Sequence, residues 1–146
     1  MTTIAYHHES GIIAYESRLT RSGTICSDDF EKSFEKDGIT FVMTGSIADQ
    51  QQLIADYPSF SADYVYRCHG VMIMDREAYS FCFNDNQEFE VFKLSFNEAW
   101  GSGSDHALTA MDCGNSASEA VELAISRDCS SGGKVRQISV SNGMGV

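Results

Sequence analysis

The sequence is poor in basic residues and in long apolar runs, and each shortage excludes a class of protein. Ten lysines and arginines stand against 21 aspartates and glutamates, so the net charge is −11. Because phosphate groups are bound by basic patches, we expect no nucleic-acid partner. No apolar run approaches the ~20 residues of a membrane-spanning helix, so we expect no membrane partner either.

Proline and regularly spaced cysteines are also scarce. One proline and twelve glycines leave no room for a disordered linker, and 146 residues suit a single domain, which we place at 1–146. Five cysteines without regular spacing argue against a disulfide framework and suit a reducing cytosol. The N-terminal segment lacks the basic region and apolar core of a secretion signal, so we expect a cytoplasmic protein.

What the chain does contain is a series of strand patterns interrupted by helical ones. The strand patterns cover 3–6, 11–16, 30–34, 39–44, 71–74, 78–83, 89–96 and 135–140. The helical patterns cover 47–57, 105–113 and 117–125. Pro58 ends the first of these helices, and Ser116 with Glu119 forms a capping box before the third. This order predicts an α+β fold in which antiparallel sheets carry helices, an αββα sandwich.

The first residues form a candidate catalytic terminus. If Met1 is removed after synthesis, Thr2 carries both a hydroxyl nucleophile and a free α-amine that can act as its base. The reference pKa of an α-amine, ~7.7–8.0, leaves it partly neutral at cytosolic pH, so no deep burial is needed. Many chains begin Met-Thr without any chemistry, however, so the terminus alone is weak evidence.

Six motifs follow one another in a set order. They are Thr2-Thr3-Ile4, Glu16-Ser17-Arg18-Leu19-Thr20, Lys32 sixteen positions after Glu16, Thr44-Gly45-Ser46-Ile47-Ala48-Asp49, Gly101-Ser102-Gly103, and Arg127-Asp128-Cys129-Ser130-Ser131-Gly132-Gly133. Each is weak alone, but this order from residue 2 to residue 133 is hard to obtain by chance. The chain resembles a β-type proteasome subunit, or the peptidase subunit of the bacterial two-component ATP-dependent protease. Both belong to the N-terminal nucleophile hydrolases.

The resemblance implies a threonine-type endopeptidase that cleaves peptide bonds through an acyl-enzyme on Thr2. Lys32 would supply a fixed positive charge beside the nucleophile and would itself be held by Glu16. Gly45 would donate its backbone N–H to the tetrahedral oxyanion. Three more residues would hydrogen-bond around the amine and orient it, namely Ser102, Asp128 and Ser131. Taken singly, these loop residues are more often ordinary turn and cap residues.

The resemblance also implies an apolar first specificity pocket. Its positions fall on Leu19, Phe30, Phe34, Met43 and Ile47. This set implies cleavage after hydrophobic residues, although the same side chains could equally belong to the core. Lys32 has a similar alternative, because the same lysine could be an ordinary exposed residue of the surface.

Histidines and cysteines offer weaker candidates. His7 and His8 are adjacent, so in an extended segment their side chains would point apart, which disfavours a metal site. Cys68-His69 suggests a thiol–imidazole pair, but sequence neighbours seldom meet that geometry and no supporting motif follows. We therefore expect neither a metal nor a cofactor.

Two departures from the family pattern bear on activity and assembly. Glu16 replaces an aspartate, one methylene shorter, at the end of a strand that is one residue short. The segment between the first helix and Val71 has room for one helix where family members carry two, so the first helical layer of the expected four-layer sandwich is shortened. The resemblance implies a homo-oligomer, which could be a ring, a peptide or unfolded-protein substrate and an unfoldase partner. A catalytically silent assembly or binding module with the same fold is the alternative.

Overall fold

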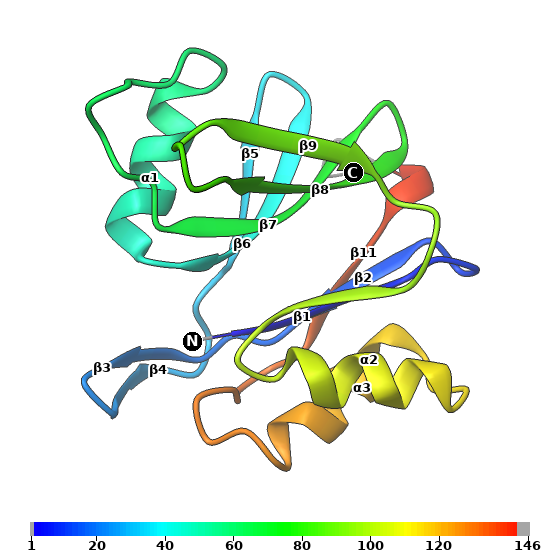
Figure 1. Ribbon diagram of the computed structural model, residues 1–146. Coiled ribbons are helices and arrows are strands. Elements are labelled where there is room, and N and C mark those ends of the chain that lie inside the picture. The colour runs from blue at the N-terminus through cyan, green and yellow to red at the C-terminus, as the bar shows by residue number, and fades with distance from the viewer. Residues whose placement is uncertain (1, 143–146) are drawn as a thin grey trace.

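The computed structural model describes residues 2–142 and contains eleven strands and three α-helices (Figure 1). The strands are β1 Thr3–His7, β2 Ile12–Tyr15, β3 Leu19–Arg21, β4 Thr24–Ser27, β5 Ser33–Lys36, β6 Ile39–Gly45, β7 Cys68–Met74, β8 Glu77–Phe83, β9 Phe89–Lys93, β10 Glu98–Gly101 and β11 Arg136–Ser139. The helices are α1 Ile47–Asp56, α2 Ser104–Asp112 and α3 Ala117–Ile125, with a 3-10 turn at Val140–Asn142. The predicted α+β class is confirmed.

The strands form two antiparallel sheets and a separate hairpin. One sheet has the order β10-β1-β2-β11 and the other the order β5-β6-β7-β8-β9, while β3 pairs only with β4. Helices α2 and α3 lie on the outer side of the first sheet, and α1 lies on the outer side of the second (Figure 1). None of the helices in the described part of the chain is long and apolar enough to cross a membrane.

Alternation along the central strands produces the core between the two sheets. In β1, Ile4 and Tyr6 face that core, and in β6 Val42 faces it from the opposite sheet. Phe41 and Met43, the neighbours of Val42, point the other way and pack beneath α1. This is the period of two that a strand imposes on its side chains, here with apolar residues on both faces. Both faces of each sheet are therefore covered.

Small side chains set the distance between the first sheet and its helices. Ala5 of β1 lies opposite Ala99 of β10 and Ala14 of β2, so three alanines form a row across three strands. Helix α3 packs against this row with its own alanines, including Ala120 and Ala124, which are fully buried. Because the interface is built from methyl groups, the helices approach the strands closely and hold the loops at their ends in place.

Several segments differ from the sequence prediction, and the strand predicted at 89–96 ends at Lys93. The strand predicted at 30–34 begins only at Ser33, so the backbone around Lys32 is irregular. The polar segment 17–29 contains the hairpin β3–β4, and 98–101 forms β10, which pairs with β1. The prediction missed these strands because β3, β4 and β10 are short and are stabilised by pairing with distant or bulged partners, not by their own pattern.

One helix covers the outer face of the five-stranded sheet in the described residues. Helix α1 begins at the N-cap Ser46, whose hydroxyl accepts a bond from the Asp49 N–H at 3.4 Å. Asp49 is buried and also accepts bonds from the Tyr64 hydroxyl at 2.5 Å and the Arg67 N–H at 2.9 Å. A single buried carboxylate therefore ties the loop after α1 to the junction between β6 and α1.

Candidate active site

Thr2 lies directly before β1 and is held against the loop that follows β10. Its side chain and backbone are 4% exposed. Its carbonyl accepts bonds from the Ser102 hydroxyl at 3.4 Å and the Gly103 N–H at 3.5 Å. Gly101 allows this approach, because a Cβ at that position would lie 2.0 Å from the Thr2 carbonyl oxygen. The Gly-Ser-Gly motif thus brings a distant loop onto Thr2.

Lys32 connects Thr2 to Glu16. Its ammonium donates to the Thr2 Oγ1 at 3.0 Å and to the Glu16 Oε1 at 2.5 Å. The residue is only 3% exposed, so the alternative of an exposed surface lysine is wrong. Burial lowers the pKa of Lys32, and the charge and hydrogen bond of Glu16 oppose that shift. A buried ammonium is accordingly aimed at the threonine oxygen.

Glu16 is fully buried and its carboxylate accepts four hydrogen bonds. Oε1 accepts from Lys32 and from the Thr3 N–H at 3.3 Å, and Oε2 accepts from the Arg18 N–H at 3.0 Å and the Gly132 N–H at 2.9 Å. Four donors around one carboxylate satisfy a charge that would otherwise be costly to bury. The extra methylene of glutamate does not break the ion pair with Lys32.

Asp128 organises the hydroxyl groups on the other side of Thr2. Its Oδ2 accepts bonds from Ser102 at 2.6 Å and Ser131 at 2.7 Å, and Ser131 in turn lies 2.7 Å from the Thr3 hydroxyl. Desolvation raises the pKa of Asp128, but the bonds from Ser102, Ser131 and the Ser130 N–H outweigh it and leave the pKa lowered. The carboxyl is therefore ionised at neutral pH. Thr3 was not a predicted site residue, although its hydroxyl is the last member of this series of hydrogen bonds.

Gly45 ends β6 with φ of +121°, a conformation that favours glycine. A Cβ at this position would lie 2.2 Å from the Arg67 carbonyl oxygen, so there is also no room for a side chain. The Ser46 N–H donates to that same oxygen at 3.0 Å and fixes the turn into α1. The sequence motif predicted that this glycine belongs to the site, but only the structure shows that the Arg67 backbone lies against it.

A cavity of about 180 Å³ brings Thr2, Lys32 and Gly45 together. Leu19 and Ile47, two of the predicted pocket residues, line it as well. The rest of the lining is polar and consists of Arg18, Thr20, Ser46 and Gln50.

Three residues of the predicted pocket, namely Phe30, Phe34 and Met43, are not in the lining of this cavity. Met43 is fully buried beneath α1 because β6 turns it toward that helix, and Phe34 packs against the same cluster. Phe30 is half-buried and its N–H donates to the Ser17 carbonyl at 2.9 Å, outside the cavity lining. The cavity is therefore smaller and more polar than the five apolar positions suggested.

The other candidates from the sequence gain no support from the structure. Burial raises the pKa of the Cys68 thiol to about 12, with a further contribution from the charge of Asp49, so this thiol is a poor nucleophile. Within residues 2–142, no three histidine, cysteine, aspartate or glutamate side chains are grouped so that they could hold a metal ion.

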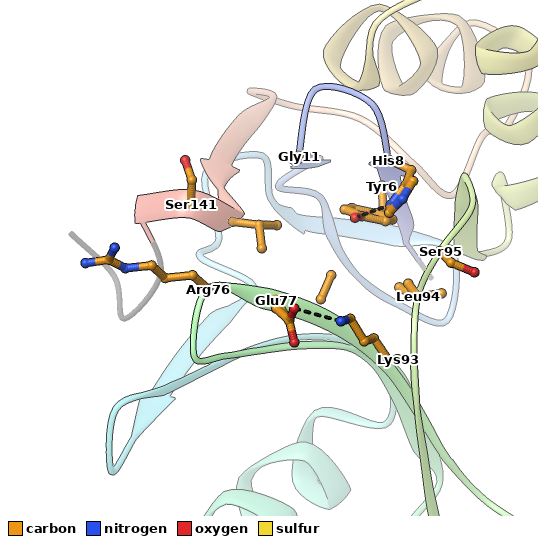
Figure 2. Close-up of a pocket in the computed structure, with 11 residues that line it drawn as sticks. Tyr6, His8, Gly11, Arg76, Glu77, Lys93, Leu94, Ser95 and Ser141 are labelled. Carbon is orange, nitrogen blue, oxygen red and sulfur yellow. Dashed lines mark hydrogen bonds and ion pairs between the residues drawn. The ribbon is translucent and has the colours of Figure 1, made fainter.

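A second cavity, of about 440 Å³, lies beyond the other end of β1 (Figure 2). Polar groups in its wall pair with one another: the Tyr6 hydroxyl with His8 Nδ1 at 2.7 Å, and Lys93 with Glu77 at 2.7 Å. Figure 2 shows Arg76 extending away from the other labelled side chains. Although this cavity is larger, it contains none of the predicted site residues.

Substituting Gly45 by alanine is expected to disrupt the site locally. Both the positive φ and the contact with the Arg67 carbonyl oppose a Cβ, so Gly45→Ala should lower the free energy of unfolding by at least about 3 kcal/mol. Gly11→Ala is the matched control, because Gly11 has φ of +67° but nothing within 4 Å of an added Cβ. That variant should lose only about 1–2 kcal/mol. Urea denaturation measures both, and equal losses would contradict the proposed crowding at Gly45.

Comparison with known proteins defines the fold. Neither a protein-family model nor a curated protein sequence matches the chain. BPH of Thiobacillus denitrificans, a bacterial proteasome homologue, matches with a TM-score of 0.69 and 18% identity over 94% of this chain and 96% of that chain. The same protein in complex with Epoxomicin gives 0.68 and 19% over 94% and 97%. Eukaryotic HslV from Trypanosoma brucei gives 0.72 and 16% over 94% and 98%. The chain has a proteasome β/HslV-like fold.

Proposed function

We propose that this protein is an N-terminal threonine peptidase that forms an acyl-enzyme on Thr2 once Met1 has been removed. The observation that carries the proposal is the hydrogen bond from the buried Lys32 ammonium to the Thr2 hydroxyl oxygen, with Glu16 behind the lysine. A buried cation in this position stabilises the oxygen as it loses its proton. Removing two charged groups from water costs free energy, and an ion pair that served only the surface would avoid this cost by staying exposed.

In the proposed first step, the Thr2 Oγ attacks the carbonyl carbon of the scissile peptide bond. Its proton passes to the α-amine of Thr2, directly or through water, and then to the leaving amine as the C–N bond breaks. The product is an ester between Thr2 and the acyl half of the substrate. Water then attacks this ester while the same amine accepts the water proton. The amine returns that proton to the Thr2 Oγ as the acyl C–O bond breaks, which releases the carboxylic acid and restores the free hydroxyl.

The surrounding residues have separate roles in this step. Lys32 offsets the negative charge that develops on the Thr2 oxygen, and Glu16 holds the ammonium in place. The Gly45 N–H donates to the oxyanion of the tetrahedral intermediate. Ionised Asp128, with Ser102 and Ser131 as its donors, favours the protonated amine after it has accepted the proton.

The same proposal covers the layers, the substrate and the assembly. The arrangement of α1, two sheets and the α2–α3 pair is the αββα sandwich of N-terminal nucleophile hydrolases, with one helix in its first layer. The substrate is a peptide or unfolded protein, and Leu19 and Ile47 contact the residue on the acyl side of the scissile bond. The protein acts in the cytoplasm as a homo-oligomer, and an unfoldase supplies it with unfolded substrate. The fold shared with BPH and HslV supports these assignments.

Intact mass spectrometry after treatment with a peptidyl epoxyketone tests the proposal. Such a reagent bonds to both the hydroxyl and the amine of an N-terminal threonine, so its adduct reports nucleophile and base together. We expect the purified protein to lack Met1 and to gain the mass of one reagent per chain, localised to Thr2 by fragmentation. Retention of Met1 in an oligomer that does not react would instead support the catalytically silent module.

A further inference from the structure

Gln50 is a buried polar residue of the cavity that takes no part in the proposed reaction. Gln50 lies in the first turn of α1, is 2% exposed and lines the same cavity as Thr2, Lys32 and Gly45. Its position in a helical pattern predicts nothing more than a surface glutamine, which is why sequence reasoning missed it. Its neighbour Gln51 is exposed, as expected of a glutamine on a helix.

The Gln50 side chain reaches back to the glycine before the helix. Its Nε2 donates to the Gly45 carbonyl at 3.2 Å, while its backbone N–H donates to the Ser46 carbonyl at 2.9 Å. The Gly45 carbonyl is thus fixed by a side chain, and the next N–H, that of Ser46, is fixed by Arg67 at 3.0 Å. Together these bonds determine the orientation of the peptide group that follows Gly45.

The other half of the Gln50 amide is unsatisfied. Its Oε1 is buried and has no hydrogen-bond partner among the described residues. A buried acceptor without a partner opposes folding, and native proteins contain few of them. An apolar side chain of the same length, such as methionine, would avoid this cost. The glutamine is therefore poorly explained by stability alone, and its donor to Gly45 is what an apolar residue could not replace.

We propose that Gln50 is a positioning residue for catalysis, which orients the oxyanion-binding glycine through the Gly45 carbonyl. The inference rests on the proposed function, because it assigns a purpose to that glycine only if Thr2 is acylated. The bond from Nε2 fixes the peptide group on the carbonyl side of Gly45, while the pairing of β6 with β7 fixes the amide side. With both sides held, the Gly45 N–H cannot rotate away from the developing oxyanion. The unpaired Oε1 is the structural cost of placing a donor there.

Gln50→Met tests this inference by separating rate from stability. We expect the rate of Thr2 acylation by a peptidyl epoxyketone to fall about tenfold, because a donor displaced by a fraction of an ångström loses much of its effect. The melting temperature should rise, or fall by no more than ~3 °C, since the variant also loses an unsatisfied acceptor. Gln51→Met, the same change at the exposed neighbour, should leave both quantities unchanged.

Gln50→Glu provides a readout that a purely structural role would not move. A neutral glutamic acid can donate its O–H to the Gly45 carbonyl, whereas an ionised one repels that oxygen. The acylation rate of Gln50→Glu relative to the wild type should therefore fall as pH rises from about 5 to 8, because a buried carboxyl titrates above its reference value.

The outcomes of these experiments are distinct. A Gln50→Met variant with the wild-type acylation rate, or one whose melting temperature falls steeply with its rate, would overturn the positioning role. A constant rate ratio for Gln50→Glu across this pH range would also overturn it. If the wild-type protein itself lacks Met1 and is not labelled, the proposed function fails first, and the inference fails with it.

Discussion

Thr2→Ala is expected to abolish peptide cleavage, with a fall of at least about 10⁴-fold in the acylation rate. The variant retains the α-amine, the Lys32–Glu16 pair and the Asp128 network, but it has no oxygen to attack the carbonyl carbon. The loss should appear in kcat and not in substrate binding, since the cavity walls are unchanged. Hydrolysis of a fluorogenic peptide by the assembled protein measures kcat, and epoxyketone labelling measures the acylation rate.

Thr2→Ser is the matched control for this substitution. It keeps the hydroxyl and the amine and removes only a methyl group, so it should be labelled on residue 2 and should still cleave peptide. Residual cleavage by Thr2→Ala at the rate of the wild type would show that the activity resides elsewhere. The oligomeric state of the three proteins should be identical, because Thr2 is 4% exposed within its own chain and offers little surface to a neighbouring subunit.

Lys32→Met is expected to have the second-largest effect, because it acts on activity and stability together. Removing the ammonium leaves the Glu16 carboxylate buried without its cation, which should cost about 3–5 kcal/mol of unfolding free energy. The acylation rate should fall about 10²–10³-fold, since no positive charge then faces the Thr2 oxygen. Chemical denaturation and epoxyketone labelling give the two quantities independently.

The double variant Glu16→Gln with Lys32→Met separates these two effects. With both charges removed, no unpaired ion remains buried, so part of the lost stability should return. The acylation rate should stay as low as in Lys32→Met, because the cation is still missing. Recovery of activity along with stability would mean that Lys32 only supports the fold, and that the proposed role at the Thr2 oxygen is wrong.

Much of the candidate site could be predicted from the sequence, because its residues occur in short motifs whose order resembles that of a known family, and these motifs lie at the ends of regular elements. Gly45-Ser46 marks the junction of a strand and a helix, and Gly101-Ser102-Gly103 marks a turn before another helix. Local pattern and turn chemistry report such junctions well. The α+β class followed from the same patterns, since the periods of strands and helices are independent of the tertiary contacts that later bury them.

Residues whose role depends on distant neighbours could not be predicted in this way. Lys32 precedes β5, which begins only at Ser33, so the period of two predicted over 30–34 could not show that it is buried, and its partners lie 16 and 30 positions away. Met43 was placed in a pocket by resemblance, but the alternation of β6 turns it toward α1. Gln50 looked like any helical glutamine until its amide was found beside the Gly45 carbonyl.

The amino-acid sequence by itself therefore determined the α+β class, most of the strands and helices, and the motifs that stand at their junctions, but not the short strands β3, β4 and β10. Only the tertiary structure decided that the Lys32 ammonium is desolvated between Glu16 and Thr2, and that four donors keep the longer glutamate in place. The physical reason is that hydrogen-bond geometry and burial are properties of groups brought together across the chain. Periodicity describes one segment at a time, so it contains no information on the hydrogen-bond geometry or the burial of groups from different segments.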